Sequence, residues 1–308
     1  MSGSVSPLPY TGNKGCIATT ILSIMPPHKV YIEPCMGSAE ILLRKKPSEK
    51  EVINDYNGDL VNLFRTLQNN DNLKSLIGRL YFSFNSEEMF RENKHMLAGI
   101  SNILDDVRET EKIIRMATKE EIEQAARFLE NQVFSFSSTG KTFAIAGKDM
   151  TKRFGRLVAA CKRLRDVIIM HRDYKDVISM QACKDALIFL DPPYKNTEKM
   201  YQKSCFDGNE HVVLFDFMYE IHNQFGGECK FIITYNNDPF IHRLAEERGF
   251  YTYVKPRQHN MKQSSSPGEM FEELLIGNYD LVKQSEENES FLSEKPTQLT
   301  LFEFQCDY

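Results

Sequence analysis

The sequence lacks the patterns that mark several large classes of protein. Its seven cysteines stand singly, with no CxxC pair and no histidine at metal-ligand spacing, so we expect reduced thiols and no metal site. There is no apolar run of about 18 residues, the length of a membrane-spanning helix. The opening MSGSVSPLPYTGNKG has no apolar signal region. These absences predict a cytoplasmic protein without a membrane segment.

The chain also lacks a net positive charge. At −5 it is not as a whole a partner for nucleic acid, so any such contact must come from a local cluster. Residues 141–165 form one, with eight Lys or Arg against a single Asp. This cluster predicts phosphate contacts, and the alternative is a solvated helix face. The candidates are Lys141, Lys152, Arg153 and Arg156.

Short apolar stretches alternate with helical patterns over much of the chain. The stretches are rich in β-branched or aromatic residues, as in buried parallel strands. They are Val30–Ile32, Val52–Ile53, Val167–Met170, Ala186–Leu190 and Phe231–Thr234. Helical periodicity lies between some of them, at 16–24, 59–67 and 211–225. This alternation predicts an α/β sheet with helices on both faces.

Two regions depart from that alternation. Residues 70–150 show charged helical periodicity and then, at 133–143, an alternation around Thr-Gly that predicts a hairpin or extended loop. We therefore expect a core formed by 1–69 and 151–282, with 70–150 inserted. The polar stretch 283–296 has the composition of a disordered segment, so 283–308 is predicted to be a flexible tail.

The strongest chemical signal is the tetrad Asp191-Pro192-Pro193-Tyr194, which follows an apolar strand. Ligand sites in open α/β sheets lie beyond the carboxyl ends of the strands. The Asp191 carboxylate and the Pro192 carbonyl can accept both N–H bonds of an exocyclic amine and orient its lone pair toward an electrophile. Tyr194 offers a face on which an extruded base can stack. The alternative is an ordinary Asp-Pro turn at a strand end.

Three further motifs suggest a nucleotide-like ligand. Glu33-Pro-Cys-Met-Gly37 joins a strand to a helix through small residues, which let a ligand approach the backbone. Asp55 closes the next strand, where ribose hydroxyls are bound in such folds. The N-terminal YTGNKG supplies Tyr10 and Lys14. The alternatives are a tight connection at Gly37 and a floppy N-terminal arm.

In this order, the motifs resemble the adenine-specific DNA methyltransferases of the D12 class, typified by the Dam methylases. The resemblance covers about residues 8–279 and includes YTGNKG, EPCMGSA, INDYNGDL and DPPY. It implies a Rossmann-like S-adenosylmethionine-dependent methyltransferase core with a mostly helical inserted target-recognition domain. The expected reaction is site-specific methylation at N6 of an adenine that is flipped out of double-stranded DNA. Cys35 and Ala39 stand where the family often has Phe and Gly.

The resemblance also implies roles for individual residues. Residues that match cofactor contacts are Tyr10, Lys14, Glu33, Gly37, Asp55 and Asp191, with Tyr174 a looser match beside the cofactor adenine. Lys14 is expected to hold the methionine carboxylate. The segment 134–143 resembles the family's recognition hairpin, where Ser137, Ser138, Thr139 and Lys141 are candidates to read bases.

Other activities remain open from the sequence. An RNA adenine or DNA cytosine-N4 amino-methyltransferase is one alternative, although cytosine enzymes more often carry Ser at the position of Asp191. A catalytically silent DNA-binding relative is another. A bacterial enzyme of this kind is either solitary or paired with a cognate restriction endonuclease.

The chain ends in a short apolar motif after its polar stretch. Gln298, Leu299, Leu301 and Phe302 look like the peptide by which bacterial DNA enzymes dock on the replicative sliding clamp. The alternatives are a chance apolar end or a final strand packed on the core.

Overall fold

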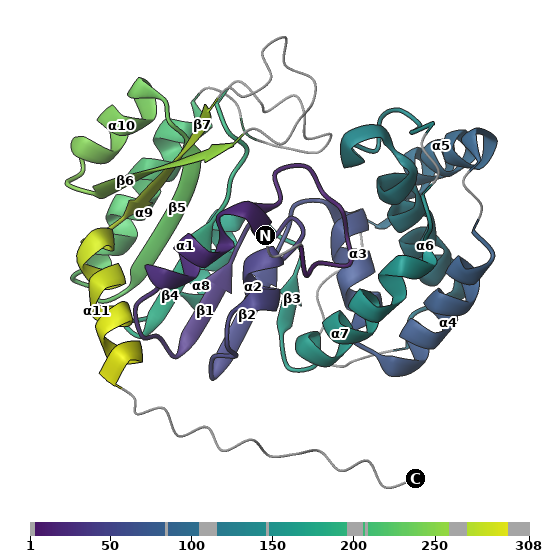
Figure 1. Ribbon diagram of the computed structural model, residues 1–308, viewed down its shortest axis with the longest axis horizontal. Coiled ribbons are helices and arrows are strands. Elements are labelled where there is room, and N and C mark those ends of the chain that lie inside the picture. The colour runs from purple at the N-terminus through teal and green to yellow at the C-terminus, as the bar shows by residue number, and fades with distance from the viewer. Residues whose placement is uncertain are drawn as a thin grey trace, which may run out of the picture.

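The computed structural model describes residues 4–83, 86–104, 116–145, 148–195, 206, 209–258 and 270–294. Within this part of the chain the strands form one seven-stranded sheet of order β3-β2-β1-β4-β5-β7-β6 (Figure 1). The strands are β1 (Val30–Glu33), β2 (Lys50–Asn54), β3 (Ile168–Met170), β4 (Ala186–Leu190), β5 (Lys230–Asn236), β6 (Tyr251–Gln258) and β7 (Met270–Gly277). All five predicted strands are confirmed, and β1 to β5 pair in parallel as expected.

Helices cover both faces of this sheet, as predicted. The α-helices are α1 (Ala18–Ser23), α2 (Glu40–Arg44), α3 (Gly58–Leu67), α4 (Asn70–Tyr81), α5 (Glu87–Leu104), α6 (Lys119–Phe134), α7 (Phe154–Leu164), α8 (Tyr174–Gln181), α9 (Glu210–Gln224), α10 (Pro239–Glu246) and α11 (Leu281–Glu294). Short 3₁₀ turns are η1 (Lys14–Cys16), η2 (Phe136–Ser138) and η3 (Thr151–Arg153). The sheet and helices agree with the Rossmann-like methyltransferase fold class.

The two faces of the sheet contribute to two apolar clusters. Along β4, Leu187 and Phe189 point into the cluster shared with α1, α2, α3, α6 and α7. Ile188 and Leu190 point into the cluster shared with α8, α9 and α10. Successive side chains of a strand alternate between faces, so a strand buried on both sides must be apolar throughout. This explains the uninterrupted apolar run before Asp191.

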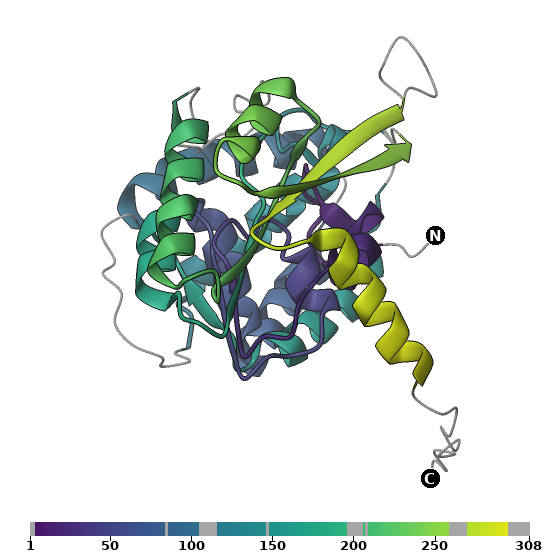
Figure 2. The ribbon, with the colours of Figure 1, turned by 90° about the vertical axis from the view of Figure 1, so that its left-hand side faces the viewer.

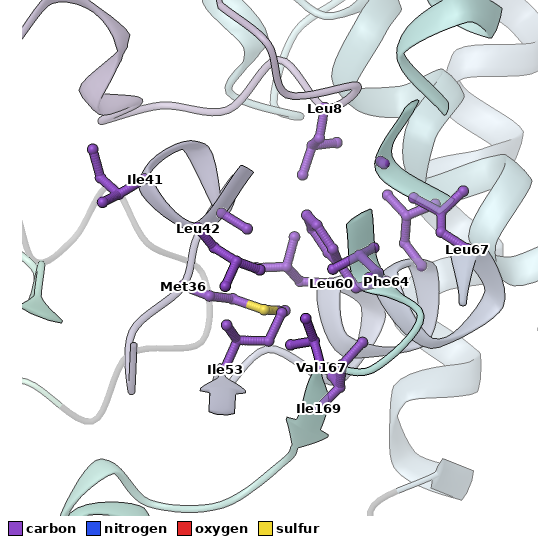
Figure 3. Packing of buried hydrophobic residues seen from close by; sticks show 14 of the residues in the cluster. Leu8, Met36, Ile41, Leu42, Ile53, Leu60, Phe64, Leu67, Val167 and Ile169 are labelled. Carbon is purple, nitrogen blue, oxygen red and sulfur yellow. The ribbon is translucent and has the colours of Figure 1, made fainter. Parts of the chain in front are cut away.

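The first of these clusters also fixes the N-terminal segment. Leu8 is fully buried and points toward Leu42, Leu60 and Phe64 (Figure 3). Full burial of one leucine stabilises the folded state by about 2 kcal/mol. The segment that leads to Tyr10 is therefore part of the core, and the alternative of a floppy arm does not hold for residues 4–14.

Helices α4, α5 and α6 lie with α3 and α7 beyond β3, at the opposite end of the sheet from β6 (Figure 1). α6 begins with a capping box. Thr118 Oγ1 accepts from the Glu121 amide, and the Thr118 amide donates to Glu121 Oε2 at 2.7 Å. Such a cap contributes about 1 kcal/mol. The mainly helical character expected for 70–150 is observed, while its boundaries as a separate domain remain a prediction.

The hairpin or extended loop expected at 133–143 is present from residue 135, where an antiparallel bridge joins Ser135 and Phe143 around η2. Its first two residues, Val133 and Phe134, instead belong to the last turn of α6. The predicted disorder from residue 283 is contradicted by α11, which is anchored on the core where Asn288 Nδ2 donates to the carbonyls of Ser23 and Met25 (Figure 2).

Candidate active site

Three acidic residues lie at the carboxyl ends of three neighbouring parallel strands. Glu33 ends β1, Asp55 follows β2 and Asp191 follows β4. Because β1 lies between β2 and β4 in the sheet, their side chains reach the same edge, and all three line one cleft. The sheet reverses its strand order here, which is where open α/β sheets bind ligands.

This cleft brings together every residue predicted to bind the cofactor. It encloses about 910 Å³ of non-atom space, part of it open to solvent, which is within the usual size of small-molecule sites. The predicted residues in its lining are Tyr10, Lys14, Glu33, Gly37, Asp55, Tyr174 and Asp191. Their proximity is a finding, and their contact with a cofactor stays a prediction.

Asp55 is held rigidly by backbone amides. Oδ2 accepts from the Gly37 amide at 3.0 Å and Oδ1 from the Asn57 amide at 2.9 Å. Burial raises the pKa of Asp55, and these amides oppose that rise. Gly37 has φ +47°, a left-handed conformation that glycine adopts without strain. The glycine thus permits the turn that aims its amide at Asp55.

Asn54, which the sequence analysis did not single out, joins the ends of three strands. Its Nδ2 donates to the carbonyls of Pro34 and Arg172 at 2.8 and 3.0 Å, and its Oδ1 accepts from the Arg172 amide. The residue is 1% exposed. The only signal in the sequence was an amide side chain directly after the apolar pair Val52-Ile53.

Asp191 forms an ion pair with Lys14. Lys14 Nζ lies 2.7 Å from Asp191 Oδ2 and also donates to the Gly12 carbonyl at 2.8 Å. The lysine side chain is 6% exposed. The Thr234 hydroxyl donates to Asp191 Oδ1 at 2.7 Å. Both oxygens of the Asp191 carboxylate therefore have a donor. Lys14 thus pairs with Asp191, whereas the sequence analysis predicts that Lys14 binds the carboxylate of the cofactor.

Tyr194 lies beneath that ion pair. Lys14 Nζ is 4.8 Å from the centre of its ring. Its hydroxyl donates to Glu273 Oε2 at 2.6 Å, and its ring lies 5.8 Å from that of Tyr235. The hydroxyl is turned into the protein, so the ring is the part of Tyr194 nearest the pair. Of the other members of the tetrad, Pro192 is buried and Pro193 lines the cleft.

Glu33 is an uncharged acid over much of the neutral range. Burial raises its pKa to about 8; hydrogen bonds oppose the rise and the nearby Asp191 charge adds to it. Oε2 accepts from the Tyr31 hydroxyl at 2.8 Å and from the Leu42 amide at 3.2 Å. A positive charge entering the cleft favours ionisation of this acid.

Aromatic side chains form the remaining walls. Tyr174 is buried, lies 5.6 Å from the ring of Phe206 and donates its hydroxyl to Glu210 at 2.8 Å. Burial and the Asp55 charge raise the pKa of Tyr10, so this phenol remains protonated. The cleft thus combines carboxyl groups on one side with flat apolar faces on the other.

The residues predicted to contact DNA lie around the loop between α6 and α7. Lys141, Lys152, Arg156 and Ser137 are exposed, and Ser138 and Thr139 are half-buried. Arg153 is half-buried, with Nη1 donating to the Pro7 carbonyl at 3.2 Å.

This loop touches the rim of the cleft. Thr11 Oγ1 lies 3.4 Å from the Ser138 carbonyl. Ser137 and Ser138 have φ of +49° and +56°, which is unfavourable for residues with a side chain. The candidate DNA-reading loop is therefore strained and adjacent to the N-terminal YTGNKG segment. DNA contact by its residues stays a prediction.

The sheet order, together with a cleft lined by Asp191 and Pro193 of the DPPY tetrad, defines a Rossmann-like methyltransferase. The family of D12 class N6 adenine-specific DNA methyltransferases matches residues 10–261, most of the chain. The chain belongs to this family. Membership implies a methyl donor and a double-stranded DNA substrate.

Individual relatives are similar at low identity. The Type II methyltransferase M.MjaIII of Methanocaldococcus jannaschii is 24% identical over 295 residues, covering 88% of this chain and 98% of that protein. The Type II methyltransferase M1.LlaDCHI of Lactococcus lactis subsp. cremoris is 23% identical over 288 residues, covering 88% and 94%. The DNA N-6-adenine-methyltransferase of Escherichia phage P1 is 24% identical over 259 residues, covering 78% of this chain and 31% of that protein.

Two further expectations concern the C-terminal motif and membrane-spanning helices. The clamp-motif residues 298–302 lie outside the described residues. Among the helices that the structure describes, none is both long and apolar enough to cross a membrane.

Proposed function

We propose that the chain transfers a methyl group from S-adenosylmethionine to N6 of an adenine flipped out of double-stranded DNA, with Asp191 and the Pro192 carbonyl as the amine acceptors. The observation that carries this proposal is the convergence of Asp191, Glu33 and Asp55 on one cleft at the strand-order reversal. The family membership of the chain identifies adenine as the target base and N6 as the atom that receives the methyl group.

The chemistry of the cleft fits this donor. A carboxylate has about four acceptor sites, so Asp55 can still accept from ribose hydroxyls while it accepts from backbone amides. The rings of Tyr174 and Phe206 suit the flat adenine of the donor. The carboxyl groups of Glu33 and Asp191 suit its positive charge. The bound donor supplies an activated methyl group.

The residues of the chain would position the amine. An exocyclic amine is a weak nucleophile because its lone pair is delocalised into the ring. Accepting its two N–H bonds at Asp191 and at the Pro192 carbonyl turns that lone pair toward the methyl group. The ring of Tyr194 would hold the base by stacking, which is worth about 1–3 kcal/mol per base.

Lys14 must yield before this complex can form. Its ammonium contacts Asp191 Oδ2 and lies over the Tyr194 ring, where the amine and the base are expected. We infer that Lys14 neutralises the half-buried Asp191 until substrate arrives. The amine gains a surplus proton on methylation, and Asp191 is the nearest carboxylate to accept it.

The decisive experiment is transfer of labelled methyl from S-adenosylmethionine to DNA, followed by nucleoside analysis of the product. We expect label on N6-methyladenine. Label confined to cytosine, or transfer to RNA alone, would contradict the proposal and favour the amino-methyltransferase alternatives. Absence of transfer with intact DNA binding would favour the silent relative.

Two macromolecular partners are also proposed. The relatives named as Type II methyltransferases support a cognate restriction endonuclease for this chain. The sequence at 298–302 supports docking on the bacterial replicative sliding clamp. Capture of the purified clamp by the full chain, but not by a Leu301→Ala/Phe302→Ala variant, tests the second. Equal capture by both would refute it.

A further inference from the structure

A carboxyl group is buried directly behind the catalytic tetrad. Glu273 lies within β7, opposite Asn236 of β5 and Lys255 of β6. It is 0% exposed, and its Oε2 accepts from the Tyr194 hydroxyl at 2.6 Å. Burying a carboxyl group is costly, and an apolar residue of similar size is often cheaper when only packing is required. A glutamate at this point therefore indicates a specific task.

The hydrogen bond has a defined direction. Burial raises the pKa of Tyr194 well above its usual value, and the charges of Asp191 and Glu273 add to the rise. The phenol therefore keeps its proton, and a phenol has one proton to donate. Because Tyr194 donates this proton to Glu273, its O–H bond points away from the cleft. With its far end tied, the Tyr194 ring cannot swing about its side-chain torsions.

The neighbouring strand β5 also holds Asp191 through a hydrogen bond. The Thr234 hydroxyl, on the neighbouring strand β5, contacts the Tyr194 phenol and donates to Asp191 Oδ1 at 2.7 Å. One side of the Asp191 carboxylate is thus set by β5, and the opposite oxygen faces Lys14.

Neighbouring groups restrict the ring further. Tyr235 lies 5.8 Å from Tyr194 with the rings tilted by 34°, and its own hydroxyl is 2.9 Å from Nδ1 of the fully buried His211. The Tyr194 ring is thereby supported by β5 and held at its hydroxyl by β7. Only a ring fixed in this way presents the same face to every incoming base.

We propose that Glu273 is a positioning residue of the methyltransferase: it holds the Tyr194 hydroxyl and thereby fixes the plane of the Tyr194 ring. This inference rests on the proposed function, since it assumes that Tyr194 stacks on the base and that Asp191 accepts the amine. It predicts that Glu273 affects the rate of transfer while leaving binding of the methyl donor unchanged.

The test is a double-mutant cycle between Glu273→Met and Tyr194→Phe, with Glu273→Gln as the conservative variant. Glu273→Met and Tyr194→Phe should each lower kcat on DNA about tenfold to a hundredfold, the factor that matches one hydrogen bond to a charged group. In the Tyr194→Phe background, Glu273→Met should cause little further loss. Glu273→Gln, whose amide oxygen still accepts from the phenol, should recover most of kcat.

Several outcomes would overturn the proposal. Equal losses from Glu273→Met with and without the Tyr194 hydroxyl would show that Glu273 acts independently of it. A loss confined to the donor dissociation constant, measured by calorimetry, would assign Glu273 to the donor site or to general packing. If Glu273→Met does not fold, Tyr194→Phe with undiminished kcat contradicts the proposal by itself.

Failure of the proposed function is distinguishable from failure of this inference. If the wild-type chain transfers no methyl group to DNA, the proposed function fails. The hydrogen bond is then still tested by the same cycle in thermal unfolding, where Glu273 and Tyr194 should show coupling. Additive changes in Tm would show that the two side chains do not interact.

Discussion

The cleft and the loop between α6 and α7 hold their polar groups in different ways. In the cleft, Asp191 and Lys14 form a 2.7 Å pair, and Asp55 is held by two backbone amides. In the loop and the first turn of α7, Lys141, Lys152 and Arg156 are exposed. Preorganised groups contribute to chemistry and specificity, whereas exposed cations contribute salt-dependent affinity. Substitutions in the two regions should therefore affect different measurements.

The largest effect is expected from Asp191→Ala. Loss of the amine acceptor should reduce methyl transfer by at least about a thousandfold, the upper range for removing one preorganised group. Asp191→Asn keeps the shape and tests the charge alone, and it should also be severely impaired. Single-turnover transfer with matched DNA measures both. Wild-type rates in either variant would remove Asp191 from its proposed role.

Asp55→Ala should have the next largest effect, and it should change the affinity for the methyl donor alone. Removing two acceptors raises the donor dissociation constant about tenfold to a hundredfold, while DNA affinity stays constant. Calorimetry with S-adenosylmethionine measures the first and fluorescence anisotropy the second. The matched control is Asp185→Ala, since Asp185 is 62% exposed and precedes β4 at the far end of the strand. Similar losses in both variants would contradict a specific site.

Lys152→Ala and Arg156→Ala should act on DNA alone. Each should weaken binding several-fold at low salt and reduce the slope of log affinity against log salt by about one, with donor affinity unchanged. Lys184→Ala is the control, because Lys184 is exposed and precedes β4, away from the cleft. An unchanged slope in both loop variants would place the DNA elsewhere.

The last expected effect concerns stability and not activity: Glu33 should change the pH dependence of unfolding. Its pKa is about 8 in the folded chain against a reference of 4.5. Between these values the unfolded chain binds fewer protons than the folded one, so Glu33 lowers stability as pH rises from about 4.5 to 8. Glu33→Gln should flatten this part of the Tm profile, whereas the exposed Glu49→Gln should leave it unchanged. Parallel profiles for wild type and Glu33→Gln would refute the shift.

Much of the sheet and part of the cleft could be predicted from local sequence patterns. Apolar runs such as Ala186–Leu190 are diagnostic because a strand buried on both faces tolerates few polar residues. The acidic residues that follow such runs must then meet at one edge. Asp55 and Asp191 were predicted for this reason, whereas the roles of Tyr10, Lys14 and Tyr174 were predicted from the family resemblance.

Contacts between distant segments were not predictable in the same way. Lys14 lies 177 positions from Asp191 and Glu273 lies 79 from Tyr194, and no periodicity records such pairings. α11 was missed because its polar composition hides a helix that is stabilised by docking on the carbonyls of Ser23 and Met25. The start of the loop after α6 was placed two residues too early, because Val133 and Phe134, which end α6, fit the same alternation.

The position of β7 has a consequence for biosynthesis. This strand is late in the chain but lies between β5 and β6 in the sheet. A nascent polypeptide still attached to the ribosome at residue 260 already contains the tetrad, yet has no Glu273 to tie Tyr194. Because the sheet also lacks β7 between β5 and β6 at that stage, we expect methylation competence to appear only after β7 leaves the exit tunnel, and chains truncated before β7 to be inactive.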